Sequence, residues 1–124
     1  MLRNAVRLLV VLFVLGLSST AFAQKATVLR VVVVKTENVA AYVQELDKGN
    51  ELMKKLGLQG HVRVWKARFA GSEAGAVVVS VEYPSMAAFA ADDAKAGASS
   101  EYQAWLKGLD KIRKIVSDSL YGEL

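Results

Sequence analysis

The sequence of 124 residues contains no cysteine and only one histidine, His61. Without cysteine there is no disulfide, no thiolate zinc ligand and no cysteine nucleophile, and a single histidine excludes metal motifs built on two. The carboxylates lack the spacing of a metal-binding loop, a glycine-rich phosphate loop is missing, and the usual hydrolase arrangements lack their parts. We therefore expect neither a bound metal nor a cofactor.

The chain also lacks a large excess of charge of either sign. The chain has 16 basic and 12 acidic residues. Arg3 and Arg7 lie in the first 23 residues, which hold no acid, so 14 basic and 12 acidic residues remain in 24–124. Four basic side chains are most simply a solvated helix face, with contact to an anionic surface as the alternative: Lys107, Lys111, Arg113 and Lys114. We expect no nucleic-acid partner, because such a balance gives no broad basic surface.

The longest apolar run lies at the start of the chain. Arg3 and Arg7 are followed by LLVVLFVLGL and then by Ala21-Phe22-Ala23 before Gln24. A basic start, an apolar stretch and a small-x-small site are typical of a secretory signal peptide. The apolar run is shorter than the roughly 20 residues that span a bilayer. Residues 1–23 are therefore predicted to be cleaved rather than to remain as a membrane anchor, giving a periplasmic protein in bacteria, or a secreted one.

Residues 24–124 are predicted to form one small domain. Such a domain without disulfides must gain its stability from packing or from a partner subunit. Runs rich in β-branched residues or alternating in polarity predict four strands, at 27–35, 60–70, 76–83 and 114–124.

Three helices are expected between these strands. Apolar positions repeat helically from Val39 to Leu56, with Thr36 as the expected N-cap and Gly57 as the C-cap. Gly49 lies on the apolar stripe of this helix, where it either permits close approach of a neighbour or marks a simple kink. A second helix begins after Ser85 and loosens near Gly97. The third is expected to open with a capping box formed by Ser100 and Gln103.

This order predicts an α+β, ferredoxin-like βαββαβ fold, with a four-stranded antiparallel sheet and helices on one face. The other face of the sheet would not be a solvated one, because the first and third strands are apolar on both sides. Leaving that surface in water is unfavourable by about 25 cal/mol per Å². A second copy of the chain is the expected cover.

At this point the sequence resembles the dimeric α/β-barrel superfamily, which includes the antibiotic-biosynthesis-monooxygenase type and related stress-responsive domains. The matching features are the strand ending in Lys35, Lys54-Lys55-Leu56-Gly57, the strand Val77 to Tyr83 followed by Pro84-Ser85-Met86-Ala87-Ala88-Phe89, and Tyr102-Gln103-Ala104-Trp105. The resemblance implies a homodimer whose two sheets pack face to face, with small-ligand pockets between sheet and helices. Members that degrade haem take an asparagine, a tryptophan and a histidine from separate elements. Here His61 and Trp65 share one strand, which argues against haem chemistry.

His61, Arg63 and Trp65 fall on one face of the second predicted strand and are candidate ligand-binding residues. A titratable ring, a fixed cation and a stacking surface together suit an anionic aromatic molecule. The alternative is that Trp65 anchors the core or the dimer interface while His61 and Arg63 reach solvent.

Arg30 is the second candidate, because a guanidinium in a valine-rich strand should find a carboxylate, and Glu82 is the expected partner. That pair would be either a polar spot in a pocket or barrel, or a structural salt bridge between strands or subunits. Four aromatic residues either line a pocket under the helices or belong to the core: Tyr42, Phe89, Tyr102 and Trp105.

Together these features predict an exported, homodimeric α/β-barrel protein that binds a small apolar or aromatic ligand, without a defined catalytic apparatus. An alternative is a cofactor-independent monooxygenase or isomerase acting on a small aromatic substrate, with His61 or Arg30 as its polar group. A third hypothesis, a purely structural interaction module, predicts that the pocket is filled.

Overall fold

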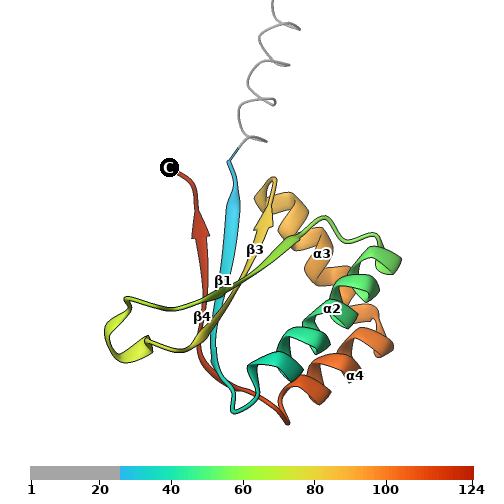
Figure 1. Cartoon of the computed structure of the whole chain (residues 1–124). Coiled ribbons are helices and arrows are strands. Elements are labelled where there is room, and N and C mark those ends of the chain that lie inside the picture. Colours follow the sequence, from blue (N-terminus) through green and yellow to red (C-terminus); the bar gives the residue numbers. More distant parts are fainter. Residues whose placement is uncertain (1–25) are drawn as a thin grey trace, which may run out of the picture.

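The computed structural model describes residues 26–124, so the predicted signal peptide lies outside the described residues. Four strands form one antiparallel sheet in the order β2-β3-β1-β4, and the helices pack on one side of it (Figure 1). This arrangement confirms the ferredoxin-like α+β fold. In chain order the elements are β1 (Val28–Lys35), α2 (Val39–Leu56), β2 (His61–Lys66), the 3₁₀ turn η1 (Gly71–Glu73), β3 (Val77–Tyr83), α3 (Met86–Ala98), α4 (Ser100–Leu109) and β4 (Lys114–Gly122).

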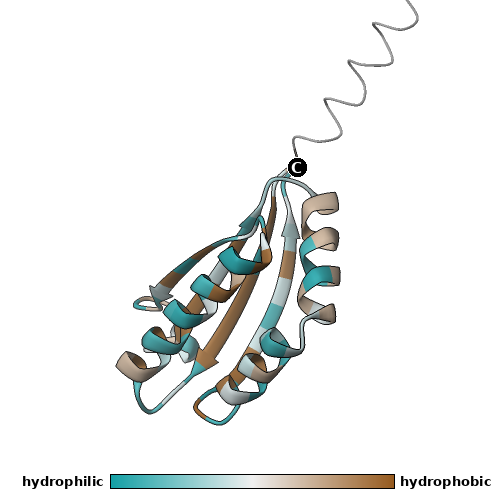
Figure 2. Cartoon of the chain, turned by 90° about the vertical axis from the view of Figure 1, so that its right-hand side faces the viewer, coloured by the Kyte–Doolittle hydropathy of each residue, from teal (hydrophilic) through white to brown (hydrophobic). Residues whose placement is uncertain are grey.

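The register of the strands gives the sheet two distinct faces. Arg30 on β1 lies opposite Val81 on β3, and Leu29 lies opposite Glu82. Because successive side chains of a strand point to opposite faces, Arg30 and Val81 face the helices while Leu29 and Glu82 face away. In Figure 2 the helices lie in front of the sheet, with hydrophobic strand segments visible between them.

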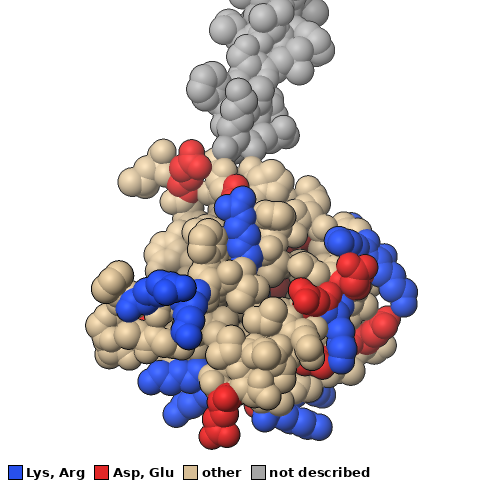
Figure 3. Space-filling model, viewed as in Figure 1, with Lys and Arg blue, Asp and Glu red and all other residues tan. Residues whose placement is uncertain are grey.

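We call the face that points away from the helices the open face. No helix of the part of the chain described packs on it. Its side chains include those of Leu29, Val31, His61, Arg63, Trp65, Val78, Ser80 and Glu82. Trp65 is 51% exposed, although large apolar side chains are usually buried. On the side of the molecule that Figure 3 shows, basic and acidic side chains lie mostly around the rim, with both signs present.

The hydrophobic core lies between the sheet and the helices. Its main cluster consists of Val34, Tyr42, Leu46, Val77, Val79 and Leu109. A smaller cluster contains Val28, Tyr83 and Ala88, and there the rings of Tyr83 and Phe89 meet edge to face with centroids 5.2 Å apart. Burial of this surface, at about 25 cal/mol per Å², holds the helices on the sheet. None of the helices in residues 26–124 combines the length and apolar character needed to cross a membrane.

The N-cap of α2 is Asn38 and not the predicted Thr36. The side-chain oxygen of Asn38 accepts a hydrogen bond from the backbone N–H of Ala41 at 3.0 Å. The Thr36 hydroxyl instead donates to the carbonyl of Ile112 at 2.8 Å and ties β1 to the segment before β4. Both residue types are favourable N-caps, so residue type alone does not distinguish them. Gly57 ends α2 with φ of 70°, as expected for a glycine C-cap.

Helix α4 is capped by Ser99 and not by the predicted Ser100. The Ser99 hydroxyl accepts from the backbone N–H of Tyr102 at 3.1 Å. Gln103 makes no capping box, since its amide donates to the carbonyl of Ala96 at 3.0 Å. Because Ser99 and Ser100 are adjacent, the sequence does not show which of them caps the helix. The geometry of the α3–α4 turn decides it.

Each strand is at least one residue shorter than the sequence predicted, and two strands also end early. Strand β2 ends at Lys66, which pairs with Val77, whereas the alternating pattern runs to Ala70. The chain beyond Lys66 enters a turn in which Gly71 and Gly75 take positive φ values, so residues 68–70 have no strand to pair with. Strand β4 likewise ends at Gly122, two residues before the predicted end.

Candidate ligand-binding site

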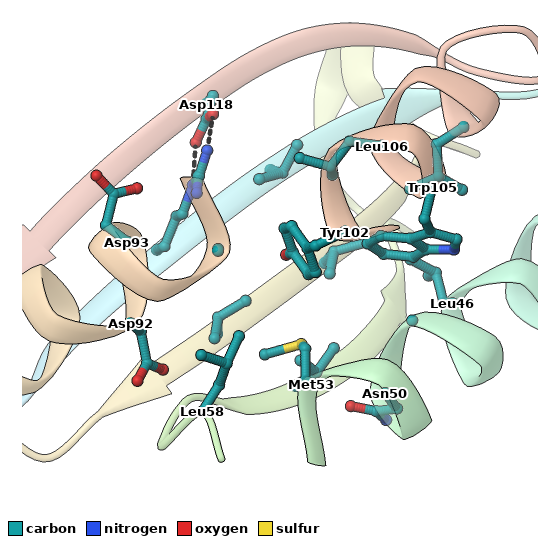
Figure 4. Close-up of a pocket in the computed structure, with 18 of the residues that line it drawn as sticks. Leu46, Asn50, Met53, Leu58, Asp92, Asp93, Tyr102, Trp105, Leu106 and Asp118 are labelled. Carbon is teal, nitrogen blue, oxygen red and sulfur yellow. Dashed lines mark hydrogen bonds and ion pairs between the residues drawn. The ribbon is translucent and has the colours of Figure 1, made fainter. Parts of the chain in front are cut away.

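A cavity of about 320 Å³ lies between the sheet and the three helices (Figure 4). All four strands contribute residues to its floor, and α2, α3 and α4 form its walls. The volume falls within the roughly 300–1,000 Å³ typical of small-molecule sites. Most of the lining is apolar and includes Val32, Leu46, Met53, Leu58, Val62, Val79, Val81 and Leu106.

Aromatic side chains of α4 form one wall of the cavity. Tyr102 and Trp105 both line it, and their ring centroids lie 5.4 Å apart. The indole N–H of Trp105 donates to the carbonyl of Glu45 on α2 at 3.1 Å. The same indole ring fills the space in which a side chain of residue 49 would begin. The prediction that Gly49 permits close approach of a neighbouring element is therefore confirmed.

A bidentate ion pair forms the polar end of the cavity. Arg30 of β1 donates from Nε to Oδ1 of Asp118 at 2.9 Å and from Nη2 to Oδ2 at 2.6 Å. The hydrogen bond to the Asp118 carboxylate raises the pKa of Arg30 and lowers the pKa of Asp118. Both side chains keep more than a third of their surface exposed, at 40% and 37%, so their free N–H and oxygen groups remain accessible.

The predicted pairing of Arg30 with Glu82 is wrong. Glu82 lies opposite Leu29 on β1 and His61 on β2, and its side chain faces away from Arg30. The sequence placed both residues on strands but did not give their register, and a shift of one residue reverses the face. Asp118 was missed because its segment appeared as the alternating tail of the chain. An arginine in the central strand needs a carboxylate, but the sequence offered several.

Two tyrosine hydroxyl groups lie at the cavity. Burial raises the pKa of Tyr83 to about 12 and also raises the pKa of Tyr102, while the charge of Arg30 opposes both shifts. Both phenols are therefore neutral near pH 7. A neutral phenol can donate one hydrogen bond to a ligand and accept others from it.

Asp92 on α3 holds one wall of the cavity in place. Its side chain is only 3% exposed, and its carboxylate accepts hydrogen bonds from the backbone N–H of Gln59 at 2.9 Å and of Gly60 at 2.8 Å. These bonds tie α3 to the loop between α2 and β2. No local sequence pattern around Asp92 indicates this role, because it depends on a contact between distant segments.

The other candidates on β2 lie together on the open face, as the alternation predicted. His61, Arg63 and Trp65 border a shallow concavity there, with Glu82 directly across from His61. The indole N–H of Trp65 donates to the Ser80 hydroxyl at 2.8 Å. These residues lie on the side of the sheet opposite the cavity, so His61 and Arg30 do not share a site.

Tyr42 and Phe89 do not line the cavity. Tyr42 is completely buried, and its hydroxyl accepts a hydrogen bond from Nη1 of Arg113 at 3.2 Å. Phe89 packs against Tyr83 in the smaller core cluster. For these two residues the structure supports the core alternative. Within residues 26–124, no cluster of three or more histidine, aspartate or glutamate side chains is arranged to hold a metal ion.

The sequence matches no protein-family model and no curated protein. Solved structures nevertheless share the fold. An uncharacterised NIPSNAP-like domain protein from Burkholderia xenovorans superposes with a TM-score of 0.61 and 13% identity, covering 82% of this chain and 85% of that one. For SnoaB, a cofactor-independent oxygenase from Streptomyces nogalater, the TM-score is 0.58 at 11% identity, over 79% and 93% of the two chains.

A third solved structure extends this group. A putative antibiotic biosynthesis monooxygenase from Bordetella bronchiseptica has a TM-score of 0.54 at 11% identity, with coverage of 80% of this chain and 96% of that one. The chain thus has the fold of NIPSNAP-like and antibiotic-biosynthesis-monooxygenase-like proteins, in agreement with the resemblance seen in the sequence.

Proposed function

We propose that this protein binds a small, flat and largely apolar molecule in the cavity between sheet and helices. The cavity itself carries the proposal, because about 320 Å³ of mostly apolar space remains open beside Trp105 and next to the Arg30–Asp118 pair. Pockets that bind small molecules combine apolar walls with a few polar groups in this way. A purely structural module would be expected to fill such a space with side chains, as in an ordinary close-packed core.

Binding of naphthalene, observed by ligand-detected NMR, tests this proposal. Ala96 lines the cavity, whereas Ala94 lies on the exposed side of the same helix. Ala96→Phe should fill the cavity and abolish the naphthalene signal, and Ala94→Phe should leave it unchanged. Absence of binding to the unmodified protein, or equal binding to both variants, would contradict the proposal.

We also propose that two copies of the chain pack open face to open face. The central strand contributes Leu29 and Val31 to this face, and Trp65 stands half exposed beside them. Exposed apolar patches on soluble proteins commonly mark interfaces. The resemblance to dimeric α/β-barrel proteins supports the same arrangement, in which the two sheets enclose a barrel.

Export is a separate proposal, supported by the sequence of residues 1–23. Cell fractionation and sequencing of the N-terminus of the purified protein test it. A periplasmic or secreted chain that starts at Gln24 is expected. A chain that keeps Met1, or that stays with the membrane after high-salt washing, would contradict cleavage.

A second candidate function is cofactor-independent oxygenation of an aromatic substrate. The fold shared with SnoaB favours it, and Arg30, which lines the cavity, keeps N–H groups that Asp118 does not use. His61 is no longer a candidate for this role, since it faces away from the cavity. The test is oxygen consumption with a naphthalene quinol above the uncatalysed rate. Loss of this consumption in Ala96→Phe but not in Ala94→Phe is the expected result for an oxygenase.

A further inference from the structure

We propose that the Arg30–Asp118 pair recognises a neutral ligand carrying a hydrogen-bond acceptor and an N–H or O–H donor on adjacent atoms, such as a lactam or an α-hydroxyketone. This inference rests on the proposed ligand-binding function and specifies the chemistry of the ligand. It follows from three features of the cavity: the unused hydrogen-bonding groups of the pair, the charges of the lining, and the position of the aromatic wall.

The pair retains both donors and acceptors after its own hydrogen bonds are made. Guanidinium has five N–H groups, and Arg30 uses one on Nε and one on Nη2 for Asp118. Its Nη1 has no hydrogen-bond partner among residues 26–124. Each carboxylate oxygen of Asp118 accepts one bond from Arg30 and has a further lone pair. The pair therefore presents an N–H donor of Arg30 next to a carboxylate acceptor of Asp118. A ligand that has an acceptor next to a donor can bond to both.

The charges around the cavity disfavour an anionic ligand. Its lining contains two arginines and three aspartates: Arg30, Arg113, Asp92, Asp93 and Asp118. Asp118 already compensates Arg30, and Arg113 lies 3.3 Å from the Asp110 carboxylate. An anion would thus find no uncompensated cation among the lining side chains described. The carboxylate of Asp92 is occupied by backbone N–H groups, so it offers little to a cation, and the third aspartate, Asp93, is exposed to solvent.

The aromatic wall determines the shape of the ligand. Figure 4 shows Asp118 at one end of the site and Trp105 at the other, with Tyr102 between them. A flat ring system lying along Tyr102 toward Trp105 would place its polar edge at the ion pair. Charge-assisted hydrogen bonds of this kind are roughly twice as strong as neutral ones and depend strongly on geometry.

The test compares matched bicyclic probes on the full protein by ligand-detected NMR. Carbostyril has a lactam N–H beside a carbonyl, N-methylcarbostyril lacks the donor, and naphthalene lacks both groups. Carbostyril should bind about tenfold more tightly than either of the other two, which corresponds to one additional well-formed hydrogen bond. Naphthoate and protonated naphthylmethylamine, an anion and a cation of similar size, should bind more weakly than carbostyril.

Asp118→Asn tests the role of the pair through the order of the probe affinities, which would not change if the pair were purely structural. Without the carboxylate charge Arg30 becomes an uncompensated cation, so the preference should invert. Carbostyril affinity is expected to fall about tenfold and naphthoate affinity to rise by a similar factor, while naphthalene changes less than about twofold. Glu82→Gln is the matched control, because Glu82 faces the other side of the sheet, and it should leave the order of the probes unchanged.

Naphthalene binding separates the two levels of the proposal and also reports whether each variant is folded. If the unmodified protein binds naphthalene, and binds carbostyril no more tightly than naphthalene, the inference about the ion pair is overturned and the proposed function stands. A preference of the unmodified protein for naphthoate or naphthylmethylamine overturns it too. If no probe binds, both the function and the inference are contradicted. Should Asp118→Asn lose naphthalene binding, Arg30→Met replaces it and must lose the carbostyril preference while keeping naphthalene.

Discussion

The indole ring of Trp105 lies against the backbone of Gly49 so closely that a Cβ atom on residue 49 would overlap three of its carbon atoms. Gly49→Ala should therefore lower the free energy of unfolding by about 1–3 kcal/mol, the usual cost of overpacking. This is expected although alanine is the better helix former by about 1 kcal/mol. Urea denaturation followed by circular dichroism measures the change.

Gly108 on α4 is the control for this substitution, because a Cβ atom there would meet nothing within 4 Å. Gly108→Ala should raise the free energy of unfolding by roughly 0.5–1 kcal/mol through helix propensity alone. If both substitutions stabilise the protein equally, the packing of Trp105 on α2 is not as described.

Asp92 should contribute to stability through its hydrogen bonds to the backbone of Gln59 and Gly60. Asp92→Ala leaves two N–H groups without their acceptor and is expected to cost about 2–4 kcal/mol. Hydrogen exchange of those two amides should accelerate selectively. Asp93→Ala, which changes the exposed neighbouring carboxylate, should have little effect on either measurement. Equal effects of both substitutions would contradict the assigned role of Asp92.

The ion pair between Arg30 and Asp118 should show a modest coupling energy in a double-mutant cycle with Arg30→Met and Asp118→Leu. About 1 kcal/mol is expected, because the geometry is bidentate but both side chains are more than a third exposed. A second cycle, between Arg30→Met and Glu82→Gln, should give additive effects, since the two side chains lie on opposite faces. Coupling in the second cycle and none in the first would overturn the pairing.

Stability should fall in acid partly through Asp118. Its pKa is lowered in the folded protein by the hydrogen bonds from Arg30, so its contribution is present above the ordinary aspartate pKa, near 4, and is lost as the pH falls through the lowered value. Asp118→Asn should therefore lose less stability than the unmodified protein between about pH 4 and pH 2. Thermal unfolding across this range measures the difference. Parallel curves would mean that Asp118 is not stabilised by Arg30.

The open face should control the oligomeric state. Trp65→Glu places a charge in the proposed interface and should convert a dimer to a monomer in sedimentation equilibrium at micromolar concentration. Phe69→Glu changes an aromatic residue that is more exposed than Trp65 but lies in the β2–β3 loop, outside the strands of the sheet, and should leave the dimer intact. A dimer that survives Trp65→Glu would indicate another interface.

Much of the fold could be predicted from the sequence, because runs of β-branched residues define the strands around Val31 and Val79 and helical periodicity defines the helix from Val39 to Leu56. The close approach at Gly49 was also predictable, since glycine is unfavourable on the apolar stripe of a helix unless a neighbour requires the space. These features depend on local sequence and on the 3.6-residue and two-residue repeats.

The site was less predictable, because it depends on register and on contacts between distant segments. Glu82 is one residue out of register with Arg30 and faces the other side of the sheet, and the actual partner, Asp118, lies on a different strand, β4; no local pattern encodes either fact. The caps Asn38 and Ser99 likewise differ from the predicted ones by two residues and one residue. Tyr42 and Trp105 have the same helical spacing signal, yet only Trp105 lines the cavity.

Native mass spectrometry of the protein, purified from the cells that make it, tests the central claim most directly, because it reports subunit number and retained ligand in one spectrum. A dimer that carries a small molecule, released by Ala96→Phe and retained by Ala94→Phe, is the expected result. A monomer whose mass shows no bound molecule, and which takes up neither naphthalene nor carbostyril, would contradict both the dimer and the ligand site.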